Sequence, residues 1–278
     1  MKLFLILVLL SFNTLAKIKI HGHRGARAVL PENTLSAIKY VVENKIDIIE
    51  FDLASTKDGV LVLAHDGILN SENCTIPKKY QGQPVPYYSI TSKEVMKIDC
   101  GKNQPKKYPK QKALKNEKIP SLRQVLTYLN KVKYQGMLNI ETKLFPGHPE
   151  VTPTPQKFAR LLNDELKRYH DQSKVIVQSF DYRSLVSIQK LNKNVKTSLL
   201  TYANLLPLVE VFKVYKFNYW SPHHRWMTKQ MILNLEKIGV ETHPWTLNSP
   251  KDWDRAIKMG VHGIITDDPV ALQSYLKK

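Results

Sequence analysis

Short apolar runs alternate with amphipathic stretches along most of this 278-residue chain. The apolar runs have the length and the enrichment in branched and aromatic residues that are typical of β-strands. In the stretches between them, apolar residues recur every three or four positions, as they do on the buried face of a helix. Strands are predicted at 17–21, 47–53, 137–141, 175–179, 196–201, 217–221, 241–247 and 263–266, and helices at 34–44, 121–131, 155–169, 182–190, 228–238 and 251–259.

The alternation of strand and helix implies a sheet of parallel strands, because each return to the same end of a sheet needs a crossover. Eight predicted units in about 260 residues match the usual size of one (β/α)8 barrel. The sequence therefore predicts an α/β fold, a (β/α)8 TIM-type barrel over residues 17–278. In such barrels the active site lies at the C-terminal ends of the strands.

Residues 67–120 interrupt the alternation. This region is rich in Lys, Pro, Gln and Tyr and has weak periodicity. We interpret it as a small insertion after the second strand that lies over the barrel mouth. Its segment 102–118 has seven lysines and one glutamate, which indicates a flexible, solvated loop. The alternative is a surface that recruits anionic substrates or lipid headgroups.

The N-terminus has the pattern of a secretory leader. Residues 3–10 are apolar and follow one lysine, and small residues precede a polar start, so we expect a signal peptide that ends at Ala16. The apolar core is too short to span a bilayer, although an uncleaved anchor is the alternative. A secreted or periplasmic location follows. It favours a disulfide between Cys74 and Cys100 over two reduced thiols.

The chain is strongly basic, with 42 Lys and Arg against 24 Asp and Glu. Loss of Lys2 with the leader leaves 41 against 24, or a net charge of +17. This charge would favour contact with an anionic membrane surface or a polyanion, and a solubilising surface is the alternative. The sequence has no nucleic-acid-binding motif and its lysines are scattered, so no nucleic-acid partner is predicted.

Charged and histidine residues lie in, or directly after, the first two predicted strands. His23 and Arg24 follow the first strand in a loop bracketed by glycines. Glu50 and Asp52 lie two residues apart in the second strand, so their side chains point to the same side. Such a pair is usually the solvated face of an antiparallel sheet. Here the flanking positions are apolar too, so the strand is buried on both sides and the pair needs a cation.

A further apolar run, 59–64, ends at His65, and a lone histidine at a strand end is more often structural than catalytic. In combination, however, these segments resemble the signature of the glycerophosphodiester phosphodiesterase family. The signature consists of HRG at 23–25, PENT at 31–34, ExD at 50–52 and HD at 65–66. Similar segments follow at 141–143, 178–180, 245–248 and 266–269, so the resemblance covers nearly the whole chain after the leader.

The resemblance implies metal-dependent hydrolysis of a small glycerophosphodiester to sn-glycerol 3-phosphate and an alcohol. By analogy, Glu50, Asp52 and Glu141 hold one divalent cation, and all-oxygen ligands suit Ca2+ or Mg2+. His23 and His65 would divide the proton transfers, because imidazole titrates near neutral pH. Attack by water and attack by the glycerol hydroxyl through a cyclic phosphate both remain open.

Four other residues are candidates for substrate binding. Arg24 and Lys143 would neutralise the charge that develops on the phosphoryl oxygens. For Lys143 the alternative is a simple ion pair at the barrel rim. Gln178 and Trp245 lie at the ends of the fourth and seventh predicted strands. Gln178 would donate to the substrate or merely close a loop, and Trp245 would stack on glycerol or belong to the barrel core.

The other histidines are assigned weaker roles. His223 and His224 follow the sixth predicted strand and are candidates for contact with the alcohol or for a second, weak metal site, with ordinary rim histidines as the alternative. His21, His148 and His243 are predicted to be structural.

Two other functions compete with glycerophosphodiester hydrolysis. The first is a phospholipase D-like activity of the sphingomyelinase D type, which acts on intact lipid and needs an apolar loop that enters the bilayer. The weak candidates for such a loop are residues 87–88 and 215–220. The second is a non-catalytic binding module on the same barrel, which would have no use for paired proton-transfer groups.

Overall fold

A computed structural model describes residues 17–203 and 207–278 of the chain. The predicted signal peptide, residues 1–16, lies outside the described residues. Within the two described ranges, no helix is both long enough and apolar enough to cross a membrane.

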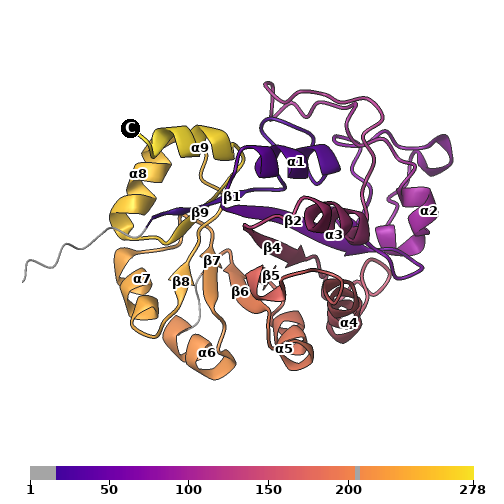
Figure 1. The fold of residues 1–278 in the computed structure, drawn as a ribbon. Helices are drawn as coiled ribbons and strands as arrows, with labels where there is room; N and C mark the ends of the chain where they lie inside the picture. The colour runs from indigo at the N-terminus through magenta and orange to yellow at the C-terminus, as the bar shows by residue number, and fades with distance from the viewer. Residues whose placement is uncertain (1–16, 204–206) are drawn as a thin grey trace, which may run out of the picture.

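Eight parallel strands form a nearly closed barrel with helices around it, as the sequence predicts (Figure 1). Around the barrel the strands follow the order β9, β1, β2, β4, β5, β6, β7, β8. Three backbone hydrogen bonds bridge the remaining gap. His262 N–H donates to Thr242 O over 3.0 Å, Ile265 N–H donates to Pro244 O over 3.0 Å, and Leu247 N–H donates to Ile265 O over 3.1 Å. The barrel strands are β1 Lys19–Gly22, β2 Ile48–Ser55, β4 Met137–Thr142, β5 Val175–Ser179, β6 Lys196–Thr201, β7 Tyr219–Pro222, β8 Glu241–Thr242 and β9 Gly263–Thr266.

The helices occupy the outer layer, and the sequence predicts six of them to within a few residues. It misses α2, α6 and α9, which are short. The helices are α1 Leu35–Glu43, α2 Ser92–Val95, α3 Leu122–Lys131, α4 Pro155–Leu166, α5 Tyr182–Leu191, α6 Leu208–Tyr215, α7 Lys229–Glu236, α8 Pro250–Met259 and α9 Pro269–Tyr275. Short 3-10 turns are η1 Lys78–Tyr80, η2 Tyr87–Ser89 and η3 Gln172–Lys174.

Helix α3 shows how the sequence sets these elements. Ser121 accepts a hydrogen bond from Gln124 N–H, and the Gln124 side chain accepts from Ser121 N–H, which forms a capping box. The apolar residues of α3 recur at helical spacing and all lie buried against the sheet. They are Leu122, Val125, Leu126 and Leu129.

Strand β2 is the central strand for the site. All eight of its residues are buried between β1 and β4. The run 59–64 forms β3, Leu61–Leu63, which pairs antiparallel with the end of β2 rather than joining the barrel. Ala64 N–H donates to Asp52 O over 3.1 Å, so this hairpin returns the chain to the barrel mouth at His65.

The seventh predicted strand, 241–247, is wrong in its extent, because β8 covers only Glu241–Thr242. Pro244 has no N–H and cannot continue a ladder of hydrogen bonds. Trp245 instead forms an isolated bridge with His223 beside the barrel mouth.

The insertion packs with the end of β2 and with β3 in a small core, here called the insertion core, which is separate from the main core of the barrel. It lies beside α1 and α3, at the upper right in Figure 1. A disulfide with an S–S distance of 2.03 Å joins Cys74 to Cys100 within it. All seven lysines of 102–118 are exposed, yet Gln111 in the same segment is buried, so the segment packs on the barrel at one side.

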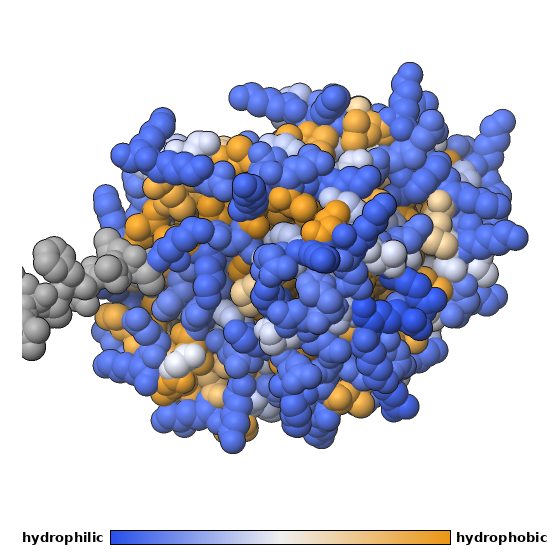
Figure 2. Space-filling model, viewed as in Figure 1, coloured by the Kyte–Doolittle hydropathy of each residue, from blue (hydrophilic) through white to orange (hydrophobic). Residues whose placement is uncertain are grey.

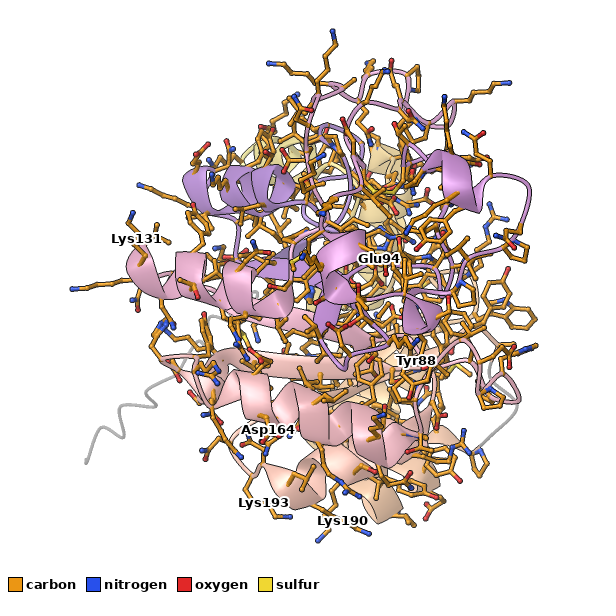
Figure 3. The ribbon with its side chains drawn as sticks, turned by 90° about the vertical axis from the view of Figure 1, so that its right-hand side faces the viewer. Tyr88, Glu94, Lys131, Asp164, Lys190 and Lys193 are labelled. Atoms are coloured by element: carbon orange, nitrogen blue, oxygen red, sulfur yellow. A yellow bond between two sulfur atoms is a disulfide. The ribbon has the colours of Figure 1, made fainter. Side chains whose placement is uncertain are left out.

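The basic charge is spread over the molecule. Figure 2 shows a face covered largely by hydrophilic side chains with apolar patches between them. In Figure 3, Lys131, Lys190 and Lys193 project outward from different parts of the helical layer. This distribution suits a solubilising surface.

Candidate active site

Three carboxylates meet inside the barrel, on β2 and β4. Asp52 is directly opposite Glu141 in the parallel register, and Glu50 lies on the same side of β2 as Asp52. All three side chains are buried. One oxygen from each lies within 4.8 Å of the others. The structure thus brings together the three residues that the sequence analysis selected as metal ligands.

Two cations lie against these carboxylates. Lys143 Nζ is 2.5 Å from Glu141 Oε1 and 3.2 Å from Asp52 Oδ1. Arg24 Nε is 3.4 Å from Asp52 Oδ2, and Arg24 N–H donates to Glu50 Oε2 over 2.7 Å. Negative charge still exceeds positive charge in the group.

The pKa values of the carboxylates reflect this excess. Burial, then the charges of Asp52 and Glu141, raise the pKa of Glu50 well above its usual value. Burial also raises the pKa of Glu141, and Lys143 offsets this only in part. For Asp52, burial acts in the same direction, but Lys143 and other neighbouring cations outweigh it and hold the pKa well below its usual value. Buried, mutually repelling oxygens fit a hard divalent cation.

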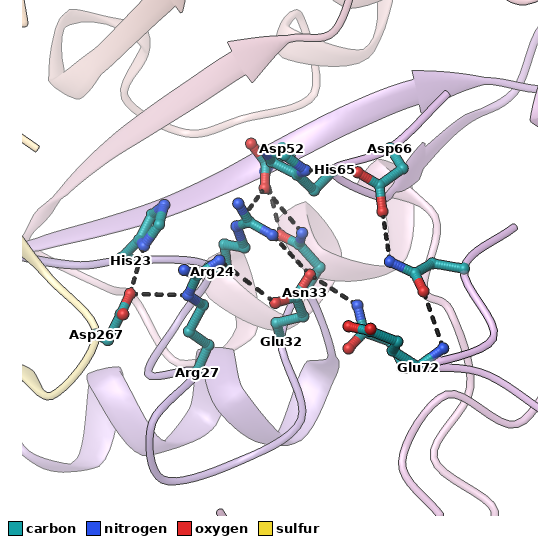
Figure 4. A network of polar contacts seen from close by, with 12 residues as sticks. His23, Arg24, Arg27, Glu32, Asn33, Asp52, His65, Asp66, Glu72 and Asp267 are labelled. Carbon is teal, nitrogen blue, oxygen red and sulfur yellow. Dashed lines mark hydrogen bonds and ion pairs between the residues drawn. The ribbon is translucent and has the colours of Figure 1, made fainter. Parts of the chain in front are cut away.

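His23 follows β1 and forms a dyad with Asp267, which follows β9 (Figure 4). Its Nδ1 lies 2.6 Å from Asp267 Oδ1. Since an ionised carboxylate only accepts, His23 Nδ1 carries the proton and Nε2 is free for other partners. Burial, then the charge of Arg27, lower the pKa of His23 to about 3 despite Asp267. His23 is therefore neutral at physiological pH and suited to accept a proton.

His65 stands where the β2–β3 hairpin returns to the barrel mouth. Its Nδ1 is 2.9 Å from Asp66 Oδ1, and about a third of its side chain is exposed. The hydrogen bond from His65 lowers the pKa of Asp66 to about 2, so this carboxylate is ionised. Both histidines are thus oriented by a carboxylate at Nδ1.

The local sequence explains the shape of the loop after β1, residues 23–25. Arg24 has φ of 51° and Gly25 has φ of 82°, and a Cβ on Gly25 would lie 2.6 Å from Ala37 Cβ. The tight turn presents the Arg24 guanidinium to Glu32 Oε1 over 2.8 Å (Figure 4). Glycine is therefore required after the His-Arg pair.

Asn33 links this loop to the carboxylates. Its Nδ2 donates to Asp52 Oδ2 over 2.9 Å, and its Oδ1 accepts from Asp52 N–H over 3.1 Å (Figure 4). The paired bonds fix the Asp52 carboxylate relative to β2.

Gln178 and Trp245, the weaker candidates, both border the same cavity. Gln178 Nε2 donates to Glu50 Oε1 over 2.9 Å, and its Oε1 accepts from Asn139 Nδ2 over 3.0 Å. Gln178 therefore orients the carboxylate of Glu50. Trp245 Nε1 donates to Ser221 O over 2.9 Å, which turns its ring toward the cavity.

The cavity at the C-terminal ends of the strands measures about 440 Å³ and has two unlike sides. Most of the charged side chains, together with His23 and His65, come from β9, β1, β2 and β4 and the loops that follow them. The side formed by β5 to β8 contributes apolar and aromatic groups. They are Phe180, Leu200, His223 and Trp245, with the Trp245 ring centroid 5.6 Å from Phe180 and 5.0 Å from His223.

Several residues that border the cavity or fix its histidines had no role assigned from the sequence. Asp267 lay in a segment similar to the family, and Arg27 lay three residues after the HRG motif, but neither had a role. Lys107 reaches the cavity from the insertion, which sequence alone could not place. Asn248 Nδ2 donates to Asp267 Oδ2 over 2.7 Å, again across distant loops.

The remaining histidines are resolved as follows. His21 and His243 are buried and in contact, with His21 Nε2 2.9 Å from His243 Nδ1. His148 is exposed near Glu150. His223 borders the cavity, and His224 is buried with its Nδ1 2.6 Å from an Arg255 nitrogen. Within residues 17–203 and 207–278, neither belongs to a group of three ligands that would suit a metal.

The two weak candidates for a loop that enters a bilayer, residues 87–88 and 215–220, have their largest apolar side chains buried. Tyr87 is buried in the insertion core, and Phe217 and Trp220 are buried in the barrel core. The apolar character of both segments therefore serves packing.

Comparisons with known proteins agree with the geometry. A family model described as the glycerophosphoryl diester phosphodiesterase family matches residues 23–271. A protein of Caldanaerobacter subterraneus subsp. tengcongensis, named glycerophosphodiester phosphodiesterase, is 30% identical over 94% of this chain and 99% of its own. A crystal structure from Silicibacter pomeroyi is similar with a TM-score of 0.83, at 24% identity over 91% of each chain. An Oleispira antarctica phosphodiesterase in complex with the product sn-glycerol-3-phosphate has a TM-score of 0.79, at 21% identity over 95% of this chain and 98% of that one.

Proposed function

The chain belongs to the glycerophosphoryl diester phosphodiesterase family, and from this premise we propose that it hydrolyses a glycerophosphodiester to sn-glycerol 3-phosphate and a free alcohol. One observation carries the proposal. Two histidines, each oriented by a carboxylate at Nδ1, lie at the same cavity as the buried cluster of Glu50, Asp52 and Glu141. A non-catalytic binding module has no need for this combination.

Glu50, Asp52 and Glu141 would hold one divalent cation, and their oxygen ligands suit Ca2+ or Mg2+ better than a thiolate-seeking metal. When bound, the cation would supply positive charge against the phosphoryl oxygens, as a Lewis acid. Gln178 and Asn33 each hydrogen-bond one of these carboxylates and so hold it in position.

Arg24 and Lys143 bind the phosphoryl group in this proposal. A phosphodiester carries one negative charge, and further charge develops on its oxygens as a bond to phosphorus breaks. Both side chains are about 10% exposed, at the cavity. In such a poorly solvated position their charges act more strongly than they would in water.

His23 and His65 divide the proton transfers. A neutral His23 with a free Nε2 suits removal of a proton from the attacking oxygen. His65 is more exposed and beside Asp66, and would then donate a proton to the departing alcohol. The attacking oxygen belongs either to water or to the glycerol hydroxyl.

A second candidate is phospholipase D-like hydrolysis of a lipid at an anionic membrane surface. It is favoured by three aromatic side chains that follow β5, β6 and β7 and are about half exposed. They are Phe180 at 49%, Tyr202 at 60% and Trp226 at 49% exposure. Phe180 also lines the cavity, and exposed aromatic residues suit the headgroup region of a bilayer.

A secreted or periplasmic location completes the proposal. The Cys74–Cys100 disulfide supports it, because structural disulfides persist in oxidising compartments. The sequence of residues 1–16 supports it independently.

Release of glycerol 3-phosphate from glycerophosphocholine tests the function. The purified chain without residues 1–16 is treated with EDTA and then given Ca2+ or Mg2+. We expect release to stop with EDTA and to return with one of the cations. Cleavage of sphingomyelin or a lysophospholipid instead would favour the second candidate, and no cleavage of any of the three under either metal would refute both.

A further inference from the structure

The insertion contributes an arm to the active site. Residues 101–117, here called the insertion arm, leave and return at one place, since Cys100 N–H donates to Glu117 O over 2.8 Å and Leu114 N–H donates to Gly101 O over 2.7 Å. Its base is tied to the rest of the insertion by the disulfide of Cys100.

The arm is fastened to the loop that carries His23. Gln111, which is buried, donates from Nε2 to Arg27 O over 2.6 Å. Lys112 N–H donates to Val29 O over 2.8 Å. These bonds reach main-chain atoms, so they hold the arm in place whatever side chains the loop presents.

At the middle of the arm, Tyr108 contacts the His23 dyad directly. Its hydroxyl donates to Asp267 Oδ2 over 3.1 Å. The Arg27 guanidinium carbon lies 4.9 Å from the Tyr108 ring centroid, within the range of a cation–π contact. Burial and the charge of Asp267 raise the pKa of Tyr108, so its hydroxyl remains protonated as a donor.

The carboxylate of Asp267 accepts four hydrogen bonds. His23 Nδ1 and Arg27 Nε reach Oδ1, and Tyr108 and Asn248 reach Oδ2. Of these four donors, Tyr108 is the one that the insertion supplies. Because both oxygens are occupied, the carboxylate cannot rotate, and the tautomer and orientation of His23 follow from it.

We propose that Tyr108 is a positioning residue for proton transfer by His23, acting through Asp267 and Arg27. The insertion is then part of the catalytic machinery, in addition to covering the barrel. This inference rests on the proposed function, because it presumes that His23 transfers a proton.

Tyr108→Phe tests it by removing only the hydroxyl. Loss of one charge-assisted hydrogen bond predicts a kcat that is lower by about tenfold. KM for glycerophosphocholine and the dissociation constant for Ca2+ should stay within about twofold of wild type, because Tyr108 has no hydrogen bond to Glu50, Asp52 or Glu141. In 15N NMR spectra, the His23 ring signals should move from a single Nδ1-protonated tautomer toward a mixture.

Tyr80→Phe is the matched control. Tyr80 lies in the same insertion and its hydroxyl also donates to a carboxylate, Glu94 Oε1, over 2.9 Å. This variant should turn over like the wild type.

A kcat of Tyr108→Phe within twofold of the control overturns the proposal. Unchanged His23 ring signals also overturn it, since a fall in kcat would then have another origin. Should the wild type hydrolyse no diester at all, the proposed function fails separately, and the NMR comparison alone decides whether Tyr108 positions His23.

Discussion

Asp267→Asn would test the His23 dyad most directly. The substitution keeps the shape of the side chain but removes its charge and replaces one acceptor oxygen by a donor NH2 group. At present Oδ1 receives His23 Nδ1 and Arg27 Nε, while Oδ2 receives Tyr108 and Asn248 Nδ2. We expect a large loss of turnover with the substrate-binding residues untouched.

The structure sets the magnitude. The side-chain amide of Asn248 cannot flip to present its oxygen instead of its NH2 group. Its Oδ1 already accepts from Thr266 Oγ1 over 3.1 Å and from the main-chain N–H of residue 267 over 2.8 Å. If the new carbonyl faces His23, the new NH2 group faces the Asn248 NH2 group, so one of the four bonds is lost. The others become bonds to a neutral group. A bond to a charged group contributes about 1.5–3 kcal/mol and a neutral one about 1 kcal/mol. At the lower end of this range, one lost bond of about 1.5 kcal/mol and three bonds weakened by about 0.5 kcal/mol each remove roughly 3 kcal/mol. This amounts to about a hundredfold in kcat.

The assay is steady-state hydrolysis of glycerophosphocholine, with thermal unfolding of each variant measured in parallel. Asp268→Asn is the control, because Asp268 Oδ1 caps α9 by accepting from Ala271 N–H over 3.0 Å and asparagine caps equally well. A kcat of Asp267→Asn within about threefold of this control, in a folded protein, would refute the assignment of Asp267 as the group that orients His23.

Three further predictions concern turnover, the pH dependence of stability, and metal binding. His65→Ala should abolish turnover while fold and metal affinity stay nearly intact, because its side chain is one third exposed, and a kcat comparable to wild type would refute its acid/base role. The free energy of unfolding should fall as the pH is lowered below about 6.5, the ordinary pKa of histidine, by up to about 1.4 kcal/mol per pH unit for each histidine. The reason is that burial lowers the pKa of His21 and of His243, so the unfolded chain binds more protons there, and a flat denaturant-unfolding profile would contradict it. Ca2+ or Mg2+ at about 100 times its dissociation constant should stabilise the wild type by about 2.7 kcal/mol, and Glu141→Gln should lose most of this gain. Equal gains in thermal unfolding would exclude Glu141 as a ligand.

Local sequence patterns predicted the features that depend on one or two strands. The period of two in a buried strand was enough to place Glu50 and Asp52 together, and strand count and chain length were enough for the barrel. The role of His65 needed the resemblance to a family, because its strand, β3, lies outside the barrel.

The contacts between the first and last strands, which close the barrel, could not be predicted from these patterns. His23 and Asp267 are 244 positions apart, and they meet because β1 and β9 are neighbours in the closed sheet. Tyr108 lies in a segment whose lysines indicated only a solvated loop. Its position depends on Gln111, a buried polar residue in a polar region, which no periodicity distinguishes. The prediction of a strand at 241–247 was wrong for a local reason. The apolar pattern favours a strand there, but Pro244 has no N–H to continue the hydrogen-bond ladder, and β8 ends at Thr242.

The charge balance of the site explains why its proposed cation should be divalent. Four carboxylates and three cations form one network of ion pairs: Glu32, Asp52, Glu141 and Asp267 with Arg24, Arg27 and Lys143. Glu50 is a fifth carboxylate beside this network, since it lies next to Asp52 and Glu141 and accepts from Arg24 N–H. Fully ionised, the network together with Glu50 has two excess negative charges in a poorly solvated place, where uncompensated charge is costly. A divalent cation removes the excess, whereas a monovalent cation would leave one negative charge to repel the phosphodiester. The raised pKa values of Glu50 and Glu141 have the same origin, because protons are the other cations that can reduce the repulsion. Binding of the cation should therefore precede productive binding of the substrate.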